Sequence, residues 1–229
     1  MLSERNKEEM RLWSEHKEVN EIKYPSEPVI RYLHNNFPIG KDNKILDFGC
    51  GTGRNTLVMA DMQFDIYAAD YNEICLERTK EKLEKINYQN VIYIKNDRTS
   101  IPIESSILDC IVAWGALFYC NAADRNLLFS ELNRILKIGG CFLSDFRTKE
   151  DYLYGKGKEI EKDYFILEEY LPGMNYWFCD EKAIRELYRE HGFEIVNLEK
   201  ADFYRDNMEK KVSHYHVWAK KEREQCVKI

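Results

Sequence analysis

The chain has 229 residues, a hydrophobic fraction of 44%, a charged fraction of 32% and a formal net charge of −6. This composition predicts one soluble globular domain with a sizeable core. Because phosphate binding depends on clustered Lys and Arg, the acidic balance disfavours a nucleic-acid partner. The N-terminus lacks a signal-peptide core, and the longest apolar run, 107–120, is interrupted by Asp109 and is too short to span a membrane. We therefore expect a cytoplasmic monomer or homodimer with no membrane partner.

The order of apolar segments predicts helices that alternate with strands. An N-terminal arm over 1–43 is expected to be helical over 3–22 and again after Ser26. Strands are expected at 45–48, 65–70, 91–95, 107–115 and 141–146. Helices are expected directly after the first strand, over 72–87, and over 122–136, where Gly139 and Gly140 end the helix. Such alternation indicates a parallel sheet with helices on both faces.

Residues 147–180 interrupt this alternation with a stretch rich in aromatic residues. Long connections at the carboxyl edge of a sheet are often functional, so we expect a lid or substrate-recognition insertion. A second small hydrophobic cluster under a long loop is the alternative. A helix over 180–191 and strands at 193–198 and 212–219 follow. His214 and His216 share one face of the last strand, but no third ligand is evident at useful spacing, so we expect no metal site.

The stretch KILDFGCGTGRNT (44–56) combines a buried strand, three glycines and the start of a helix. Glycine permits a positive φ and close approach of a ligand, and a helix start offers unpaired N–H groups. A dinucleotide fingerprint, G-x-G-x-x-G, needs a glycine at position 54 or 56, where Arg54 and Thr56 stand. The spacing therefore disfavours a nicotinamide dehydrogenase.

The segment ILDFGCGTG resembles motif I of the class I S-adenosylmethionine-dependent methyltransferases, in which an acid precedes Gly-x-Gly-x-Gly. The resemblance extends from about Lys44 to Lys220. It implies a doubly wound, seven-stranded Rossmann-like α/β sheet in the order 3-2-1-4-5-7-6, with the last strand antiparallel. It also implies a single domain over 1–229 whose arm covers the cofactor. The implied cofactor is S-adenosyl-L-methionine, and the product formed from it is S-adenosyl-L-homocysteine.

The resemblance also implies which residues hold this cofactor. Asp47 matches an acid that organises the glycine loop and supports contact with the amino-acid end of the donor. Asp70 matches the acid that accepts hydrogen bonds from the ribose hydroxyls, and Asp97 matches the residue that contacts the adenine amino group. Taken singly, Asp70 could instead cap a helix and Asp97 a turn. The full implied set is Asp47, Gly49, Gly51, Gly53, Asp70, Tyr71, Asp97, Arg98, Trp114 and, from the arm, Trp13 and Tyr24.

The acceptor is less defined by the sequence. Tyr119 and Arg147 lie just beyond the fourth and fifth strands, at the edge where acceptors bind in this architecture. Arg147 could hold an acidic substrate or form a surface salt bridge, and no catalytic base stands out. Trp114-Gly-Ala-Leu replaces the Asn-Pro-Pro-Tyr tetrapeptide of many enzymes that act on nucleobase or glutamine nitrogens.

We expect in-line methyl transfer to an N or O nucleophile of a small molecule. A protein acceptor stays open. A non-catalytic S-adenosylmethionine-binding regulator or subunit and a nicotinamide dehydrogenase are the alternatives.

Overall fold

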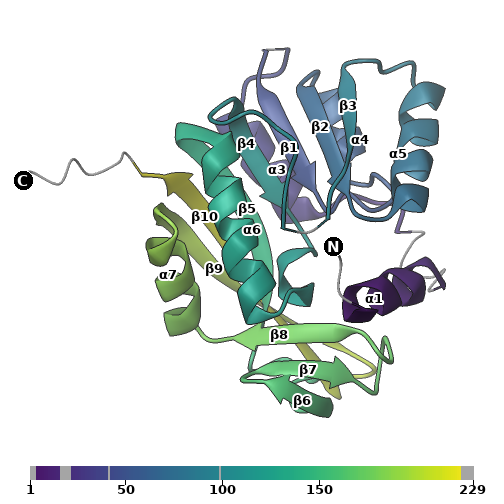
Figure 1. The fold of residues 1–229 in the computed structure, drawn as a ribbon, viewed down its shortest axis with the longest axis vertical. Coiled ribbons are helices and arrows are strands. Elements are labelled where there is room, and N and C mark those ends of the chain that lie inside the picture. The colour runs from purple at the N-terminus through teal and green to yellow at the C-terminus, as the bar shows by residue number, and fades with distance from the viewer. Residues whose placement is uncertain (1–3, 16–21, 41, 98, 223–229) are drawn as a thin grey trace, which may run out of the picture.

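The computed structural model describes residues 4–15, 22–40, 42–97 and 99–222 and contains a large mixed sheet (Figure 1). Along this sheet the main strands follow the order β3-β2-β1-β4-β5-β10-β9. They are β3 (Val91–Lys95), β2 (Asp65–Asp70), β1 (Lys44–Phe48), β4 (Leu108–Ala113), β5 (Leu136–Thr148), β10 (Lys210–Lys221) and β9 (Phe193–Arg205). The first five are parallel, and β10 is antiparallel to both β5 and β9. The expected doubly wound sheet with its antiparallel last strand is confirmed.

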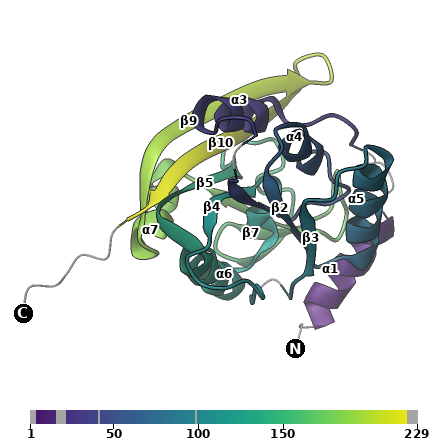
Figure 2. The ribbon, with the colours of Figure 1, turned by 90° about the horizontal axis from the view of Figure 1, so that it is seen from above.

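Helices cover both faces of this sheet (Figure 2). One face carries α3 (Glu27–Asn36), α4 (Thr56–Asp61) and α5 (Glu73–Lys85), and the other carries α6 (Ala122–Ile135) and α7 (Glu181–Glu190). A cluster of buried apolar side chains lies between the sheet and each layer of helices. In the central strand β4 only Asp109 is not fully buried, and its carboxylate accepts the N–H of Lys44 and pairs with Lys137.

Three further strands stand between β5 and α7. They are β6 (Gly157–Glu161), β7 (Tyr164–Leu167) and β8 (Asn175–Cys179), and they pair as an antiparallel sheet. β8 is buried throughout and joins the end of β5 through the pairs Arg147↔Phe178 and Thr148↔Cys179. Its side chains belong to the same apolar cluster as β4 and β5. The aromatic stretch is therefore an extension of the main core, and its function as a lid stays a prediction.

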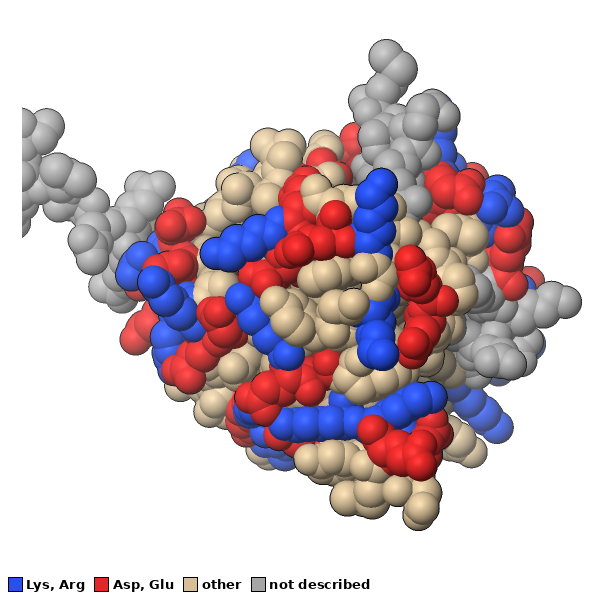
Figure 3. Space-filling view, turned by 90° about the horizontal axis from the view of Figure 1, so that it is seen from below, with Lys and Arg blue, Asp and Glu red and all other residues tan. Residues whose placement is uncertain are grey.

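The outer face of this insertion carries charges of both signs. Lys and Arg are interspersed with Asp and Glu over the side seen in Figure 3. Lys149 pairs with Asp163 and Asp180 at 2.8 and 3.0 Å, which ties the end of β5 to the insertion and to the start of α7. Within the described ranges, no helix combines the length and apolarity needed to cross a membrane.

The arm is helical, as expected, over α1 (Glu4–Glu15) and α3, and residues 16–21 of the helix predicted over 3–22 lie outside the described residues. Trp13 of α1 packs edge-on against Tyr119 with ring centroids 5.5 Å apart. Tyr119 ends the short 3₁₀ helix η1 (Leu117–Tyr119), which directly follows the β4 turn. This contact places α1 over the carboxyl edge of the sheet.

The helix predicted over 122–136 ends one residue early, and the prediction that Gly139 and Gly140 end it is wrong. α6 ends at Ile135, and Leu136 already has extended backbone angles and begins β5. Gly139 and Gly140 lie inside β5, where the pairing with β4 shifts register between Leu108 and Cys110. Gly139 has a φ of +75°, so the glycine serves a strand irregularity rather than a helix end.

Asp47 connects β1 to the segment that follows the glycine loop. Its side chain is buried, and its Oδ2 accepts a hydrogen bond of 2.6 Å from the hydroxyl of Thr56, the first residue of α4. Burial raises the pKa of Asp47 from 3.8 to about 6, and the bond from Thr56 offsets only part of this effect. The carboxylate thus holds the loop at some cost to stability when it is ionised.

This pKa predicts a specific pH dependence of stability. Because the folded state binds the proton of Asp47 more tightly than the unfolded chain, the free energy of unfolding falls as pH rises between about pH 4 and pH 6. A shift of this size corresponds to about 3 kcal/mol. We expect Asp47→Asn to remove this component, as measured by urea unfolding of both proteins from pH 4 to pH 7.

Thr56→Val provides the companion variant. It removes a donor that favours the ionised form, so the same fall in the free energy of unfolding should become larger and extend to higher pH. Parallel pH profiles for the wild type and Asp47→Asn would contradict the burial effect.

Candidate functional site

Two adjoining cavities open at the carboxyl edge of the sheet. The smaller, of about 520 Å³ including space open to solvent, lies over the ends of β1, β2, β3 and β4. The larger, of about 1450 Å³ including space open to solvent, lies over β5, β9, β10 and the insertion and also borders the glycine loop and the start of α3. Five residues line both and form their common wall: Trp13, Gly49, Gly51, Gly115 and Tyr119. Parallel sheets of this kind bind ligands at this edge.

The three predicted glycines have different environments although all have positive φ. A Cβ at Gly49 would lie 2.6 Å from the Cβ of Ala116, and one at Gly53 would lie 2.9 Å from side-chain atoms of Thr79. A Cβ at Gly51 would meet no atom within 4 Å and would enter the space of the cavities. Gly49 and Gly53 therefore allow the loop to fold tightly, and Gly51 is the position where a ligand can approach the backbone, which fits the implied donor.

Asp70 lies at the end of β2 and lines the smaller cavity together with Tyr71. Its Oδ2 accepts the N–H of Gly51 at 2.9 Å, and its Oδ1 accepts the N–H of Asn72 at 2.8 Å. The carboxylate therefore fixes the glycine loop. The helix cap after β2 is made by Asn72, which accepts the N–H of Ile74, and the role in ribose binding that the resemblance implies for Asp70 stays a prediction.

At the end of β3, Asn96 lines the smaller cavity, and the predicted residue Asp97 does not. Asp97 is exposed, and its Oδ1 accepts hydrogen bonds from Thr99 and Ser100, as a turn residue does. The buried Asn96 lines the smaller cavity instead. Contact of Asp97 with adenine stays a prediction, and Asn96 is the residue at this strand end that lines the cavity. Arg98 lies outside the described residues.

Of the predicted residues Trp13, Trp114 and Tyr24, only Tyr24 does not line either cavity. Trp13 lines both cavities, whereas Tyr24 is 74% exposed and lies near Lys23. Trp114 lines the larger cavity and packs on the ring of His216 at 4.8 Å. Trp13 therefore lies at the junction of the two cavities, where its ring can cover a bound ligand. A contact of Tyr24 with the donor stays a prediction.

Tyr119 and Tyr176 form an aromatic corner of the larger cavity. Their hydroxyl oxygens are 3.4 Å apart, and their rings meet edge-on at 5.1 Å. Burial raises the pKa of Tyr119 well above its usual value and that of Tyr176 to about 12. Both hydroxyls are therefore protonated near neutral pH, so they suit hydrogen bonding to an acceptor rather than proton removal.

Arg147 is a buried residue of the larger cavity and not a surface ion pair. Its side chain is 9% exposed, and its Nη1 donates to Oδ2 of Asp151 at 2.8 Å. Its Nε is buried and has no hydrogen-bond partner among the residues that the structure describes. The guanidinium carbon lies 5.0 Å from the ring centroid of Tyr176. A buried donor without a partner is unfavourable, so this nitrogen is suited to an acceptor atom supplied by a ligand.

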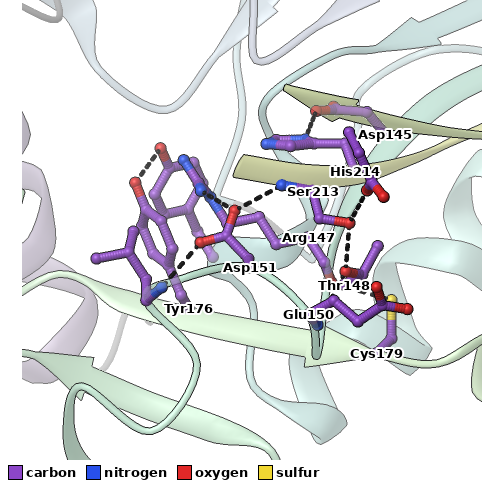
Figure 4. A network of polar contacts seen from close by, with 12 residues as sticks. Asp145, Arg147, Thr148, Glu150, Asp151, Tyr176, Cys179, Ser213 and His214 are labelled. Atoms are coloured by element: carbon purple, nitrogen blue, oxygen red, sulfur yellow. Dashed lines mark hydrogen bonds and ion pairs between the residues drawn. The ribbon is translucent and has the colours of Figure 1, made fainter. Parts of the chain in front are cut away.

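Asp145 and His214 form a hydrogen-bonded pair at the floor of the same cavity (Figure 4). Nδ1 of His214 lies 3.0 Å from Oδ2 of Asp145, and Oδ1 of Asp145 accepts the N–H of Gly115 at 2.5 Å. Burial by itself raises the pKa of Asp145, but the bonds from His214 and Gly115 outweigh it and leave the pKa below its usual value. Asp145 is therefore a carboxylate that orients the imidazole.

The sequence analysis did not single out Asp145, Asn96 or the Asp145–His214 pair. One signal was present: Asp145 is the only charged residue in the apolar stretch 141–146, and His214 alternates with His216 on a strand. The alternation of the two histidines alone does not indicate which carboxylate lies beside them. Among the described residues, no group of three or more His, Cys, Asp or Glu side chains could hold a metal ion.

Comparisons with known proteins agree with this fold. A family model described as "Methyltransferase domain" matches residues 45–140. The chain is 29% identical over 175 residues to a demethylmenaquinone methyltransferase of Lactococcus lactis, a match that covers 68% of each protein. It is 22% identical over 185 residues to a tRNA N(3)-cytidine methyltransferase of Xenopus tropicalis, covering 76% of this chain and 54% of that protein.

A solved structure has the same fold at low sequence identity. It is a 1,6-didemethyltoxoflavin-N1-methyltransferase of Burkholderia thailandensis, crystallised with 1,6-didemethyltoxoflavin and S-adenosylhomocysteine. The TM-score is 0.72 at 15% identity, and the superposition covers 95% of this chain and 87% of that one. The match over residues 45–140 and the relatives above make the chain similar to S-adenosylmethionine-dependent methyltransferases, and the solved structure shows that the fold is shared.

Proposed function

We propose that this enzyme transfers the methyl group of S-adenosylmethionine to an N or O nucleophile on a small organic acceptor by in-line displacement. The observation that carries the proposal is the larger cavity, which continues from the smaller one across Gly115 and Tyr119. The smaller cavity, with Asp70 and the glycine loop, would hold the adenosine part of the donor. The larger one has aromatic walls and a buried cation, which suit a small organic molecule.

The two similar proteins with named small acceptors support the small-molecule part of this proposal. One acts on demethylmenaquinone and the other on 1,6-didemethyltoxoflavin, as their names state. The tRNA methyltransferase is a distant match over little more than half of its length. The net charge of −6 also disfavours an RNA acceptor for this chain.

Positioning and exclusion of water are the main tasks left to the protein, because the sulfonium of the donor is already a good leaving group. Asp70 would fix the ribose through its carboxylate, and the N–H groups around Gly51 would lie along the donor. Trp13 would cover the junction of the two cavities. Tyr119 and Arg147 would then contact the acceptor side.

Asp70 provides the test of donor binding. Asp70→Asn keeps the size of the side chain but removes the charge, and loss of charge-assisted hydrogen bonds should weaken S-adenosylhomocysteine binding by about 10- to 100-fold. Calorimetry measures this affinity, and thermal unfolding verifies that the variant is folded. Glu73→Gln, an exposed acid on the adjoining helix α5, is the matched control and should bind as the wild type does.

Methyl transfer itself is tested with radiolabelled S-adenosylmethionine and a metabolite extract. We expect label in a new small compound, and we expect less of it with Asp70→Asn. Tight donor binding without transfer of label to any fraction would refute the enzymatic function and favour a non-catalytic binding protein. Label in macromolecules alone would contradict a small-molecule acceptor.

A further inference from the structure

Four ionisable side chains share one face of the β5–β10 pair at the larger cavity. Asp145 and Arg147 alternate on β5, and His214 and His216 alternate on β10. The register pairs His214 with Arg147 and His216 with Asp145, so the side chains are direct cross-strand neighbours. All four line the cavity. Residues separated by about 70 positions in the chain are thereby gathered into one polar floor.

Arg147 is the cation of this floor, and its contacts leave room for a ligand. The carboxylate of Asp151 accepts a hydrogen bond from Nη1 of Arg147. It also accepts the N–H groups of Leu153 and Ser213. Because those neutral donors share the negative charge of Asp151, part of the positive potential of Arg147 stays available to the cavity. Within the part of the chain that the structure describes, the buried Nε–H has no hydrogen-bond partner, and an anionic oxygen of a ligand would satisfy it.

Flat rings surround the guanidinium of Arg147. Its central carbon lies 5.0 Å from the ring centroid of Tyr176 and 5.8 Å from those of Phe118 and Tyr170. Aromatic faces stabilise a cation and also stack on planar ligands. The same group therefore favours a ligand that is both flat and negatively charged.

We propose that the methyl acceptor is a small planar organic acid whose anionic oxygen binds Arg147, apart from the atom that is methylated. This inference rests on the proposed function, because it assigns the acceptor to the larger cavity.

The test uses benzoate and benzamide as probes, which are both flat but differ in charge. Ligand-observed NMR on the protein with bound S-adenosylhomocysteine should show benzoate binding about tenfold or more tightly than benzamide. Arg147→Lys keeps a charge that can pair with Asp151 but loses the planar Nε–H, so the preference should fall to near equality. Arg205→Lys, at an exposed arginine on the rim of the same cavity, is the matched control and should keep the preference.

Equal binding of the two probes, no binding of benzoate, or a preserved preference in Arg147→Lys would each overturn the acidic acceptor. To separate this failure from failure of the proposed function, the extract is divided by anion exchange before incubation with labelled donor. Label transferred only to a compound of the unretained fraction refutes the acid but keeps the methyltransferase. A benzoate preference without transfer of label to any fraction supports the anion site and refutes the proposed function alone.

A second inference comes from a different observation, the hydrogen bond between Asp145 and His214. A carboxylate at Nδ1 keeps a proton on that nitrogen and leaves the lone pair on Nε2. In Figure 4 this second nitrogen points away from Asp145. The groups that face the imidazole are Arg147 and Asp145 on β5, His216 on β10 and the ring of Phe118, at 6.3 Å.

We infer that Nε2 of His214 removes the proton of the acceptor and that Asp145 is its positioning residue. The lone pair of the acceptor N or O forms a bond to the methyl carbon. The bond from that carbon to sulfur breaks, and its electron pair stays on sulfur as a neutral thioether. The proton of the acceptor moves to Nε2, and the imidazolium that forms lies beside the Asp145 carboxylate. Charge is therefore balanced within the site.

His214→Gln tests this role. We expect single-turnover transfer of label to fall by about 100-fold or more, while the dissociation constant of S-adenosylhomocysteine stays within about twofold. His34→Gln, an exposed histidine at the end of α3, is the control and should react as the wild type does. Unchanged transfer in His214→Gln would refute the base and leave the methyltransferase standing, whereas a wild type without transfer would refute the proposed function.

A second measurement tests which nitrogen of His214 carries the proton, and it does not depend on activity. ¹⁵N NMR of the imidazole groups should show neutral His214 with its proton on Nδ1, and Asp145→Asn should abolish this preference. A proton on Nε2 in the wild type would overturn the assignment.

Discussion

The acceptor side of this site depends on how the end of β5 is paired. β4 accompanies β5 only as far as the pair Ala113↔Ser144, yet β5 continues to Thr148. β10 follows one edge of this extension as far as Arg147, and β8 takes the other edge at Arg147 and Thr148. Because backbone groups in a buried strand need partners, the extension could not persist without both neighbours. The insertion therefore completes the sheet at the place where the cavity needs a floor.

Buried charges along this extension fix the register of β10. Asp145 is held by Gly115 and His214, and Arg147 is held by Asp151, whose Oδ2 also accepts the N–H of Ser213. A slip of β10 by one residue would turn His214 to the opposite face and break these bonds. Since an unpaired buried charge is strongly unfavourable, the polar network selects a single alignment of the two strands.

Much of the donor side was predictable because it is local in the sequence. The glycine loop, Asp47 and Asp70 each follow directly from a strand end, and the parallel sheet brings strand ends together without further information. Asn96 rather than Asp97 lines the cavity because Asp97 is engaged in its own turn, although contact of Asp97 with the donor stays a prediction. Gly139 lies in an irregular strand and does not end a helix. Local polar contacts of this kind do not follow from hydrophobic periodicity.

The acceptor side could not be predicted in the same way. The pairing of His214 with Arg147, and its hydrogen bond to Asp145, join strands about 70 residues apart, and the register is decided by tertiary packing. Likewise, Tyr176 reaches Tyr119 only because β8 attaches to the end of β5. The aromatic composition of a stretch does not determine which strand it will pair with.

This division has a consequence for how the enzyme can change. The loops proposed to hold the donor are anchored to the ends of β1 and β2, whereas the residues proposed to hold the acceptor lie on β5, β10 and the insertion. The two sets meet at Gly115 and Tyr119, and Gly115 also binds the carboxylate of Asp145. Substitutions on β8 or the outer part of β10 can therefore reshape the acceptor cavity without moving the glycine loop. Substitutions at Asp145 or Gly115 cannot, because a single hydrogen bond there sets the turn that both cavities share.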